Sequence, residues 1–318
     1  MKNILVLGGS YFIGKTLLPI LKNDFKDANI YVLNRGSRGQ EKGFNYIKAD
    51  RNSKDDLINV LKNKKFDYIF DISGTEKKQI TNIIEILLPE NIGLYIFTSS
   101  SAVYKEGQNI PFREDSYLGE NTKWGNYGIN KIECEEYIKE IHKKFNMKYI
   151  IIRPPYVYGK WNYVYRESYC FKRCDEQKPI IIPGDGMQQF QFINAIDLCN
   201  CMITLTKNKD SYNDIYNIGK DTITFKKWAE ECVEATAKKT RIICVDYKKY
   251  GLKERDFFPF HDYQNVLDTN KLDRFFKPKI ELKEGLKEAY EWYLLNKDYI
   301  DYRPYEKNEE IILEGENF

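Results

Sequence analysis

The amino-acid sequence predicts a doubly wound α/β fold, in which helices cover both faces of a parallel β-sheet. Over the first two thirds of the 318 residues, short runs rich in Ile, Val, Tyr and Phe alternate with longer helical patterns. The short runs are apolar on both faces, as expected of central parallel strands beneath helices. Right-handed strand–helix–strand crossovers would join these strands into one sheet.

The predicted elements follow one another in a regular order. Strands are expected at residues 3–7, 29–33, 45–48, 68–71, 94–98 and 149–152, and helices at 14–23, 54–62, 76–87 and 127–145. The last helix carries an apolar stripe, which includes Ile138 and Ile141, opposite a face rich in Lys and Glu. The first strand starts so early and meets glycines so soon that we expect no signal peptide.

The rhythm of the sequence changes after residue 153. Pro154-Pro155, the turn at 183–186 and Pro259 break the chain into shorter elements, before an amphipathic helix at 282–295. We therefore expect a first domain over 1–153, whose core can take in later segments, and a smaller C-terminal α/β lobe mainly over 154–302. A Glu-rich tail over 303–318 is expected to lie loosely on the surface.

Composition narrows the possible partners. Lys and Arg number 50 against 47 Asp and Glu, so a net charge of +3 gives no general attraction to nucleic acid or to an anionic membrane. No apolar run approaches the ~20 residues of a membrane helix. The seven cysteines lack Cys-x-x-Cys spacing and only two histidines are present, so we expect no metal site and no disulfide framework. Free thiols in a reducing cytoplasm are the ordinary interpretation.

A glycine-rich turn joins the first strand to the first helix. A tight turn and the anion-attracting N-terminus of a helix are what a dinucleotide pyrophosphate needs, and small residues let the backbone approach it. Tyr11 occupies the middle position of the Gly-x-x-Gly-x-x-Gly pattern, so its Cβ must point away from the phosphates. A plain strand–helix turn is the alternative. The predicted cofactor-binding residues of the turn are Gly8, Ser10, Tyr11, Phe12, Ile13 and Gly14.

The end of the second strand bears on the type of dinucleotide. Asn34 lies twenty residues beyond Gly14, where an NAD site usually offers Asp or Glu to the ribose. Asn does not repel a 2′-phosphate, and Arg35, with Arg38 nearby, could pair with one, which favours NADP over NAD. A solvated surface arginine is the alternative. After the third strand, Asp50-Arg51 is placed to meet the adenine, through Asp50.

A serine-rich strand end and a Tyr–Lys pair form the candidate catalytic set. Residues 98–104 read Thr-Ser-Ser-Ser-Ala-Val-Tyr, and Tyr127 and Lys131 lie four apart on one helix face. A phenol is mostly protonated at neutral pH, but a neighbouring ammonium favours the phenolate and makes a general base. Ser100 is expected to hold the substrate oxygen while Tyr127 takes or returns its proton.

Over nearly its whole length, the sequence resembles the extended short-chain dehydrogenase/reductase family, in its NAD-dependent epimerase/dehydratase branch. The resemblance is carried by residues 8–14, Asp50, 99–104, Tyr127 with Lys131, 153–159, 184–186, 192–197, 282–286 and 292–293.

The resemblance implies a Rossmann domain with a substrate lobe, and hydride exchange between a sugar carbon and nicotinamide through a keto-sugar. It implies that Tyr127 is the base, that Lys131 binds the nicotinamide ribose and that Ser100 contacts substrate. It also implies a homodimer that pairs two helices, one of them carrying Tyr127 and Lys131. Further cofactor contacts are expected at Ser73, Gly74, Thr98 and Pro154.

Several positions depart from the family pattern. Phe190 stands where nucleotide-sugar enzymes usually have the Arg that grips the diphosphate, and Tyr156 stands where an Asn often meets substrate. Ser101-Ala102 replaces the Asp–Glu pair of 4,6-dehydratases, which disfavours that dehydration. Another cation would have to replace the missing Arg, the candidates being Arg166, Lys172, Arg173 and Arg255. The candidate substrate residues are Ser101, Tyr156, Arg166, Phe190 and His261, although Arg166, Glu167 and His261 also suit a solvated surface.

Two classes of function follow. The preferred one is an NAD(P)-dependent epimerase or reductase acting on a sugar or sugar nucleotide, and the sequence does not separate these two activities. The alternative is a catalytically altered member that binds RNA or acts as a cofactor-binding regulator, because chloroplast RNA-binding relatives also have a non-glycine residue in the middle of the first turn. The near-neutral charge and the intact Tyr127 and Lys131 favour the enzyme.

Overall fold

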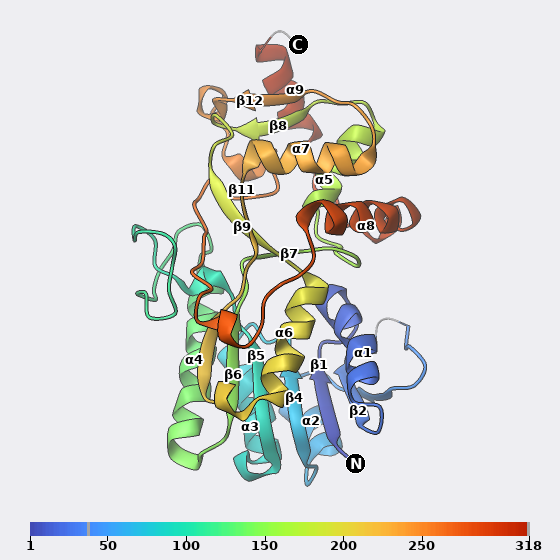
Figure 1. The fold of residues 1–318 in the computed structure, drawn as a ribbon, viewed down its shortest axis with the longest axis vertical. Coiled ribbons are helices and arrows are strands. Elements are labelled where there is room, and N and C mark those ends of the chain that lie inside the picture. The colour runs from blue at the N-terminus through green and yellow to red at the C-terminus, as the bar shows by residue number, and fades with distance from the viewer. Residues whose placement is uncertain (37–38, 317–318) are drawn as a thin grey trace. The chain divides into compact units, whose positions relative to one another are not determined.

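The computed structural model describes residues 1–36 and 39–316, and the chain divides into two compact units (Figure 1). Unit 1 consists of Met1–Pro155, Ala195–Gly219 and Leu267–Pro278. Unit 2 consists of Tyr156–Asn194, Lys220–Val266 and Lys279–Phe318.

Unit 1 is built on a seven-stranded sheet in the order β10-β6-β5-β4-β1-β2-β3, with every neighbouring pair parallel. This confirms the predicted doubly wound fold. The strands are β1 (Asn3–Leu7), β2 (Asn29–Asn34), β3 (Asn45–Lys48), β4 (Phe66–Asp71), β5 (Ile92–Thr98), β6 (Tyr149–Arg153) and β10 (Asp214–Asn217).

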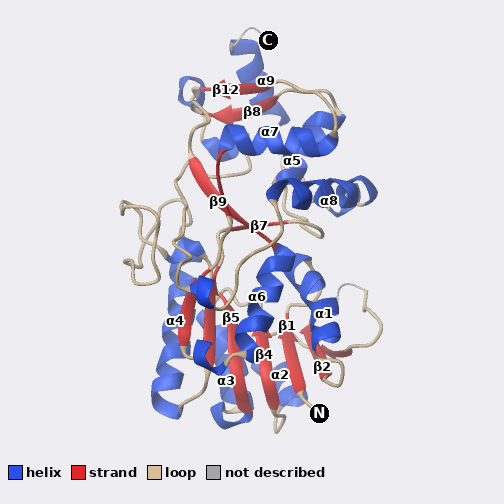
Figure 2. Cartoon of the chain, viewed as in Figure 1, coloured by secondary structure: helices blue, strands red, loops and turns tan. Residues whose placement is uncertain are grey.

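Helices cover both faces of this sheet (Figure 2). Helices α1 and α6 pack together, and α6 contacts β5 and β6, whereas α2, α3 and α4 pack in sequence on the opposite face. A core of Leu, Ile, Phe and Tyr side chains fills the space beneath α2, α3 and α4. The helices are α1 (Phe12–Asp24), α2 (Lys54–Leu61), α3 (Lys77–Leu87), α4 (Asn126–Phe145) and α6 (Ala195–Lys207).

Two later segments of the chain, Ala195–Gly219 and Leu267–Pro278, return to unit 1. Strand β10 pairs in parallel with β6 and extends the sheet. Leu267 forms a β-bridge with Phe112, and the Asp268 N–H donates to the Phe112 carbonyl at 2.8 Å. A four-residue strand gives too short a pattern to be recognised without its partner.

Unit 2 contains two small sheets and four helices among its described residues. In one sheet β9 (Gln189–Asn194) pairs antiparallel with β11 (Asp221–Thr224) and parallel with β7 (Tyr156–Tyr158). In the other, β8 (Ile180–Pro183) and β12 (Ile242–Val245) are parallel. The helices are α5 (Glu167–Asp175), α7 (Phe225–Thr236), α8 (Leu282–Leu295) and α9 (Glu306–Gly315).

Aromatic rings form the core of unit 2. Phe190 has no exposed surface, and its ring centroid lies 4.6 Å from that of Phe192, 4.7 Å from Phe225 and 5.0 Å from Phe260. The Trp228 ring stacks on Phe192 with an interplanar angle of 12°. Edge-to-face and offset contacts of this kind add to the free energy gained by burying the rings.

The C-terminal segment is ordered onto unit 2, contrary to the loose tail that its glutamates suggested. It forms α9, in which Ile312 is fully buried. Glu309 pairs with Arg173 at 2.5 Å, and both side chains are buried. The apolar positions of this short helix, rather than its charge, therefore decide its placement.

Within residues 1–36 and 39–316, every helix is too short or too polar to cross a bilayer. In the same ranges, no three His, Cys, Asp or Glu side chains come together as a metal ion would require.

Candidate active site

The turn between β1 and α1 is closed by direct backbone contacts that only glycine permits. Gly8 has a φ of +103°, and a Cβ there would lie 2.5 Å from the Cβ of Ser73. A Cβ on Gly14 would lie 2.1 Å from the carbonyl oxygen of Gly8. Because these distances are shorter than any real contact, the first turn of α1 can approach β1 only without side chains. The arrangement leaves backbone N–H groups open at the start of a helix, as a pyrophosphate needs.

Tyr11 takes the place of the middle glycine without closing the turn. It is the N-cap of α1 in extended conformation (φ −134°), and its carbonyl accepts from the N–H groups of Gly14 and Lys15 at 2.8 and 3.1 Å. The following residue, Phe12, has a φ of +29° and a buried side chain. A non-glycine residue at positive φ costs free energy, which the buried phenyl ring helps to offset. The carbonyl of Ile13 faces the Cys199 thiol at 3.7 Å.

Asn34, at the end of β2, is hydrogen-bonded to the glycine-rich turn. Its Nδ2 donates to the Ser10 Oγ at 3.0 Å, and its Oδ1 accepts from the Gly36 N–H at 2.9 Å. Arg35 is exposed beside it. Arg38, the second candidate for a 2′-phosphate, lies outside the described residues.

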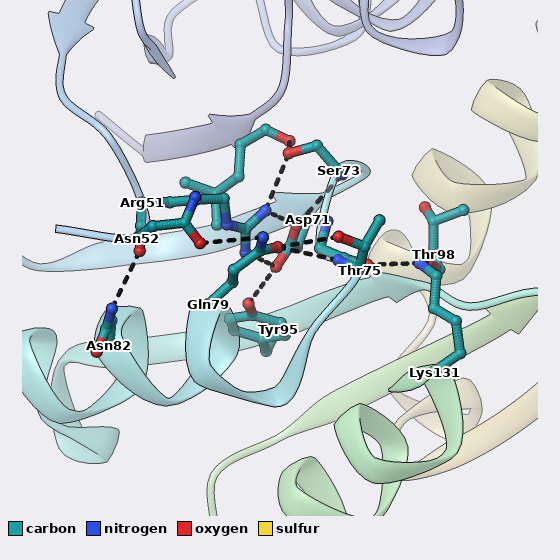
Figure 3. A network of polar contacts seen from close by, with 12 residues as sticks. Arg51, Asn52, Asp71, Ser73, Thr75, Gln79, Asn82, Tyr95, Thr98 and Lys131 are labelled. Carbon is teal, nitrogen blue, oxygen red and sulfur yellow. Dashed lines mark hydrogen bonds and ion pairs between the residues drawn. The ribbon is translucent and has the colours of Figure 1, made fainter. Parts of the chain in front are cut away.

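A buried ion pair supports the loop after β4. Arg51 binds the Asp71 carboxylate with both terminal nitrogens, at 2.9 and 2.7 Å, and also donates to the Ser73 Oγ at 2.9 Å (Figure 3). Asp71 further accepts from the Tyr95 hydroxyl at 2.6 Å and from the Gly74 N–H at 2.9 Å. The guanidinium of Arg51 therefore bonds to groups of the protein itself, rather than projecting toward an adenine.

The charges of this pair stabilise each other. Burial alone would raise the pKa of Asp71, but the Arg51 guanidinium outweighs it, so the pKa lies below its usual range. Burial and the neighbouring Asp71 charge raise the pKa of Tyr95 well above its usual range, so Tyr95 stays a neutral donor. The predicted adenine contact, Asp50, accepts from the backbone and side-chain nitrogens of Asn52 at 2.9 and 3.1 Å.

Lys131 on α4 contacts the loop after β4. Its Nζ donates to the Gly74 carbonyl at 2.5 Å and to the Thr98 carbonyl at 2.7 Å, and the side chain is buried. Figure 3 shows the ammonium approaching the ends of β4 and β5, where these carbonyls lie. The Thr98 Oγ1 is buried without a partner in the described chain.

Tyr127 lies near this lysine, and Ser100 comes two residues after Thr98, whose carbonyl the lysine binds. The Tyr127 side chain is 42% exposed, and its ring centroid lies 5.9 Å from the Lys131 Nζ. Ser100 caps the short 3₁₀ helix Ser101–Val103, and its Oγ accepts from the Ala102 N–H at 3.2 Å. Ser101 is buried, and its N–H donates to the Pro154 carbonyl at 2.9 Å. An accessible phenol beside an ammonium is therefore available for proton transfer.

A second buried ion pair fixes α4 against β6. Arg153 binds both Glu135 oxygens, at 2.9 and 2.6 Å, and its Nη1 donates to the Tyr104 hydroxyl at 3.0 Å. Ser99 donates to the same carboxylate at 2.5 Å. The helix that carries Tyr127 and Lys131 is thus tied to the serine-rich strand end.

The four candidate substrate residues of unit 2 gather around Tyr156. The guanidinium carbon of Arg166 lies 5.1 Å from the Tyr156 ring centroid, and Phe190 lies 5.9 Å from it. The Tyr156 hydroxyl contacts the His261 backbone, and burial raises its pKa to about 12. His261 itself lies 3.3 Å from a Glu254 carboxylate oxygen. Phe190 belongs to the aromatic core, which corrects its expected place at the substrate surface.

Glu167 corrects a second expectation, because it is buried rather than solvated. Its carboxylate accepts from the Asn162 Nδ2 at 3.0 Å and from the Gly159 N–H at 3.2 Å. Burial raises the pKa of Glu167.

Sequence reasoning missed the supporting carboxylates Asp71 and Glu135. Asp71 ends an otherwise apolar strand, where a charged residue must find a buried partner, and that position was the available signal. Glu135 lies on the buried face of α4 among residues that read as a solvated Lys- and Glu-rich surface. Nothing in the local pattern distinguishes it from the exposed glutamates around it.

Many solved structures resemble this fold. The UDP-glucose 4-epimerase of Thermotoga maritima, solved with UDP-glucose, superposes with a TM-score of 0.79 at 19% identity, covering 93% of this chain and 99% of its own. The dTDP-glucose 4,6-dehydratase of Bacillus anthracis, solved with NAD, gives a TM-score of 0.78 at 20% identity over 94% and 99%. These likenesses support the fold.

Sequence comparison adds a relative and a family. The chain is 26% identical over 306 residues to the chloroplast stem-loop binding protein of 41 kDa b of Arabidopsis thaliana, covering 91% of this chain and 78% of that protein. The model of the NAD-dependent epimerase/dehydratase family matches residues 4–219, which carry the glycine turn, the serine-rich strand end and the Tyr–Lys pair. The chain therefore belongs to the NAD-dependent epimerase/dehydratase family.

Proposed function

We propose that the protein is an NAD(P)-dependent epimerase or reductase that acts on a sugar nucleotide through a keto intermediate, with Tyr127 as general base. The observation that carries this proposal is the position of the Lys131 ammonium, held by two carbonyls with its Nζ 5.9 Å from the ring of a half-exposed tyrosine. A purely structural role for the helix would not require a buried lysine beside an accessible phenol.

The residues present fit a dinucleotide. The cradle at Gly8 and Gly14, which any Cβ would fill, suits a pyrophosphate at the start of α1. Ser73 lies against Gly8, and Lys131 would bind the nicotinamide ribose by exchanging one of its two carbonyl partners for a ribose hydroxyl. When bound, the nicotinamide ring would accept a hydride from the sugar carbon and return it.

The protein's own groups handle the proton. In the first half-reaction Tyr127, as phenolate, takes the proton of the sugar hydroxyl while the carbon loses its hydride, which leaves a ketone. Lys131 favours the phenolate by its charge, and the Ser100 hydroxyl holds the same oxygen by a hydrogen bond. Return of hydride to the opposite face and of the proton from Tyr127 gives the epimer. With a ketone supplied and reduced cofactor bound, the same residues would give a net reduction, in which Tyr127 would donate the proton to the oxygen while the carbon received the hydride.

We further propose NADP as the preferred cofactor. Asn34 places no carboxylate at the end of β2, and Arg35 is exposed beside it. An exposed guanidinium pairs well with a 2′-phosphate, whereas Asp or Glu at this point would repel it.

The test is turnover of nucleotide sugars by the purified protein. NAD⁺ or NADP⁺ is supplied with a panel of UDP-, GDP- and dTDP-linked hexoses, and the products are identified by NMR, while absorbance at 340 nm reports net reduction. We expect an epimer or a reduced sugar from at least one substrate, with NADP⁺ more effective. Tight cofactor binding with no turnover of any member would contradict the sugar-nucleotide assignment.

RNA binding is the second candidate, favoured by the similarity to a stem-loop binding protein and by Tyr11 in the first turn. Retention of a stem-loop RNA that weakens steeply with salt, together with no cofactor binding, would support it. Cofactor that co-purifies with the protein would support the enzyme.

A further inference from the structure

Unit 2 contains a group of arginines that its own carboxylates leave without ion pairs. Arg166, Arg255 and Arg303 come from three separate segments of this unit. Within the described part of unit 2, none of them forms an ion pair with Asp or Glu. Glu254, the neighbour of Arg255 in the chain, lies against His261.

The structure separates the four cations that could replace the missing family arginine. Lys172 pairs with Glu176 at 2.9 Å and with Glu306 at 3.4 Å. Arg173 pairs with Glu309 at 2.5 Å inside the unit. These two are neutralised by the protein, which leaves Arg166 and Arg255 as cations that could receive an external anion.

Side-chain contacts join the three segments that carry the arginines. The ring of Tyr165, next to Arg166, stacks on Tyr305 at 5.6 Å and meets Tyr302 at 5.2 Å, on either side of Arg303. The Tyr305 hydroxyl donates to the Phe258 carbonyl at 3.2 Å.

The segment of Arg255 is tied to the same place. Asn308 Nδ2 donates to the Asp256 carbonyl at 3.0 Å, so α9 is bonded directly to the residue after Arg255. The three arginines therefore stand on segments of unit 2 that contact one another, and we call them the arginine cluster (Arg166, Arg255 and Arg303).

The lowered pKa of Arg255 agrees with the closeness of the three arginines. Burial lowers the pKa of Arg255, and the like charges of Arg303 and Arg166 lower it further. The Arg166 guanidinium also lies over the Tyr156 ring, and its Nη1 donates to the Val157 carbonyl at 3.4 Å, so it is held in place. Cations that repel one another and have no acidic partner gain most from a bound polyanion.

We propose that the arginine cluster binds the diphosphate of the substrate, in place of the arginine that Phe190 replaces. This inference rests on the proposed sugar-nucleotide function and names the part of unit 2 that would recognise a nucleoside diphosphate. Forked guanidiniums match phosphate oxygens in pairs, and three of them suit two linked phosphates.

A compact site of this kind fits a small dianion better than RNA. Extended nucleic acid is bound by a basic groove that follows the backbone over several nucleotides. Here the three cations stand on contacting segments that also carry tyrosines, and the whole chain has a net charge of only +3.

The experiment is calorimetric titration of the full-length protein with inorganic pyrophosphate and with UDP. Arg255→Gln is expected to weaken both ligands at least ~10-fold, because a charge-assisted pair of bonds is lost. Arg303→Gln, on an exposed side chain that is safe for folding, is expected to weaken them in the same direction. Arg255→Lys should restore part of the affinity, because it restores the charge without the fork.

The controls separate this site from general charge and from the proposed function. Lys172→Gln removes a nearby cation that is already paired, so pyrophosphate affinity should change less than twofold. Binding of NADPH, followed by fluorescence, should be unchanged in every variant.

Three results would overturn the proposal. They are unchanged pyrophosphate affinity in Arg303→Gln with folded protein, equal losses in Lys172→Gln, and binding of stem-loop RNA that pyrophosphate does not displace. Turnover of a nucleotide sugar with unchanged KM in the arginine variants would reject the site while the proposed function stands. Pyrophosphate binding that the variants lose, with no turnover of any sugar, would support the site and reject the function.

Discussion

The two units differ in how they pair the charged side chains of their candidate sites. Around the candidate site of unit 1, buried charges are paired within the protein, as in Arg51–Asp71 and Arg153–Glu135. In unit 2 the position where relatives of the family have a cation is Phe190, fully enclosed by aromatic rings, and the arginine cluster is left without acidic partners.

This difference follows from what each unit has to accommodate. A dinucleotide has one shape, so the turn, the loop after β4 and the Tyr–Lys helix can be fixed by internal bonds. Under the proposed function, unit 2 would have to match one among many sugar nucleotides, and its cations would have to be left open to that ligand. The buried charges around the candidate site of unit 1 are therefore paired internally, and within the described residues the three arginines of the cluster in unit 2 are not.

The largest effect is expected from Phe190→Arg, which restores the residue expected from the family and tests the difference between the two units. A charge placed among Phe192, Phe225 and Phe260 has no partner, so we expect the free energy of unfolding to fall by more than about 5 kcal/mol. Urea unfolding followed by circular dichroism measures the loss. Phe190→Leu, which stays apolar, should cost only about 1–3 kcal/mol. A stable Phe190→Arg protein that gains pyrophosphate affinity would show that the two units do not differ in this way.

The next largest effect is expected from Asp71→Asn in unit 1. The change leaves the buried Arg51 charge without its carboxylate, which should cost about 3–5 kcal/mol in the same urea assay. The control is Glu85→Gln, which breaks the exposed pair with Lys54 and should cost less than about 1 kcal/mol. Equal losses in the two variants would mean that burial of the pair is irrelevant.

The same pair predicts how stability depends on pH. Asp71 has a lowered pKa in the folded protein, so its contribution is fully present above the unfolded value of about 3.9. That contribution falls as the pH drops below this value and through the lower folded pKa. Urea titrations from pH 6 to pH 3 should therefore show an acid loss in the wild type that is smaller in Asp71→Asn. Parallel curves for the two proteins would contradict the assignment.

A third test addresses chemistry in unit 1. Tyr127→Phe removes the proton acceptor and keeps the ring, so turnover of the sugar nucleotide should fall at least ~10²-fold while NADPH binding is retained. Tyr117→Phe, at an exposed tyrosine of the same unit, should leave the rate unchanged. Normal kcat in Tyr127→Phe would remove this residue from the mechanism.

The smallest expected effect concerns the preference for NADP⁺ over NAD⁺, which we assign to the end of β2. Asn34→Asp places a carboxylate where a 2′-phosphate would lie, so the ratio of NADP⁺ to NAD⁺ affinity should fall about 10-fold. Arg35→Gln should weaken NADP⁺ and leave NAD⁺ binding unaltered. If both variants keep the wild-type ratio, the end of β2 does not select the cofactor.

The fold of unit 1 could be predicted because each parallel strand is apolar by itself and each covering helix has its own stripe. Strand β10 could not, because Asp214–Asn217 is recognisable only by its pairing with β6. Tyr127 and Lys131 could be singled out by spacing, whereas Asp71 and Glu135 act through partners distant in sequence. The burial of Phe190 and of α9 depends on tertiary packing that no local pattern records.

The pairing of β6 with a strand that comes much later in the chain affects how the protein folds during synthesis. The central residues of β6, Ile150, Ile151 and Ile152, have no exposed surface, and its outer edge pairs with β10, some sixty residues later in the chain. A nascent polypeptide that has emerged only as far as residue 153 therefore leaves this edge unpaired, the kind of edge that recruits other chains. We expect a fragment of residues 1–153 to aggregate more readily than the whole chain, because residues 154–213 must be made before β10 can close the sheet.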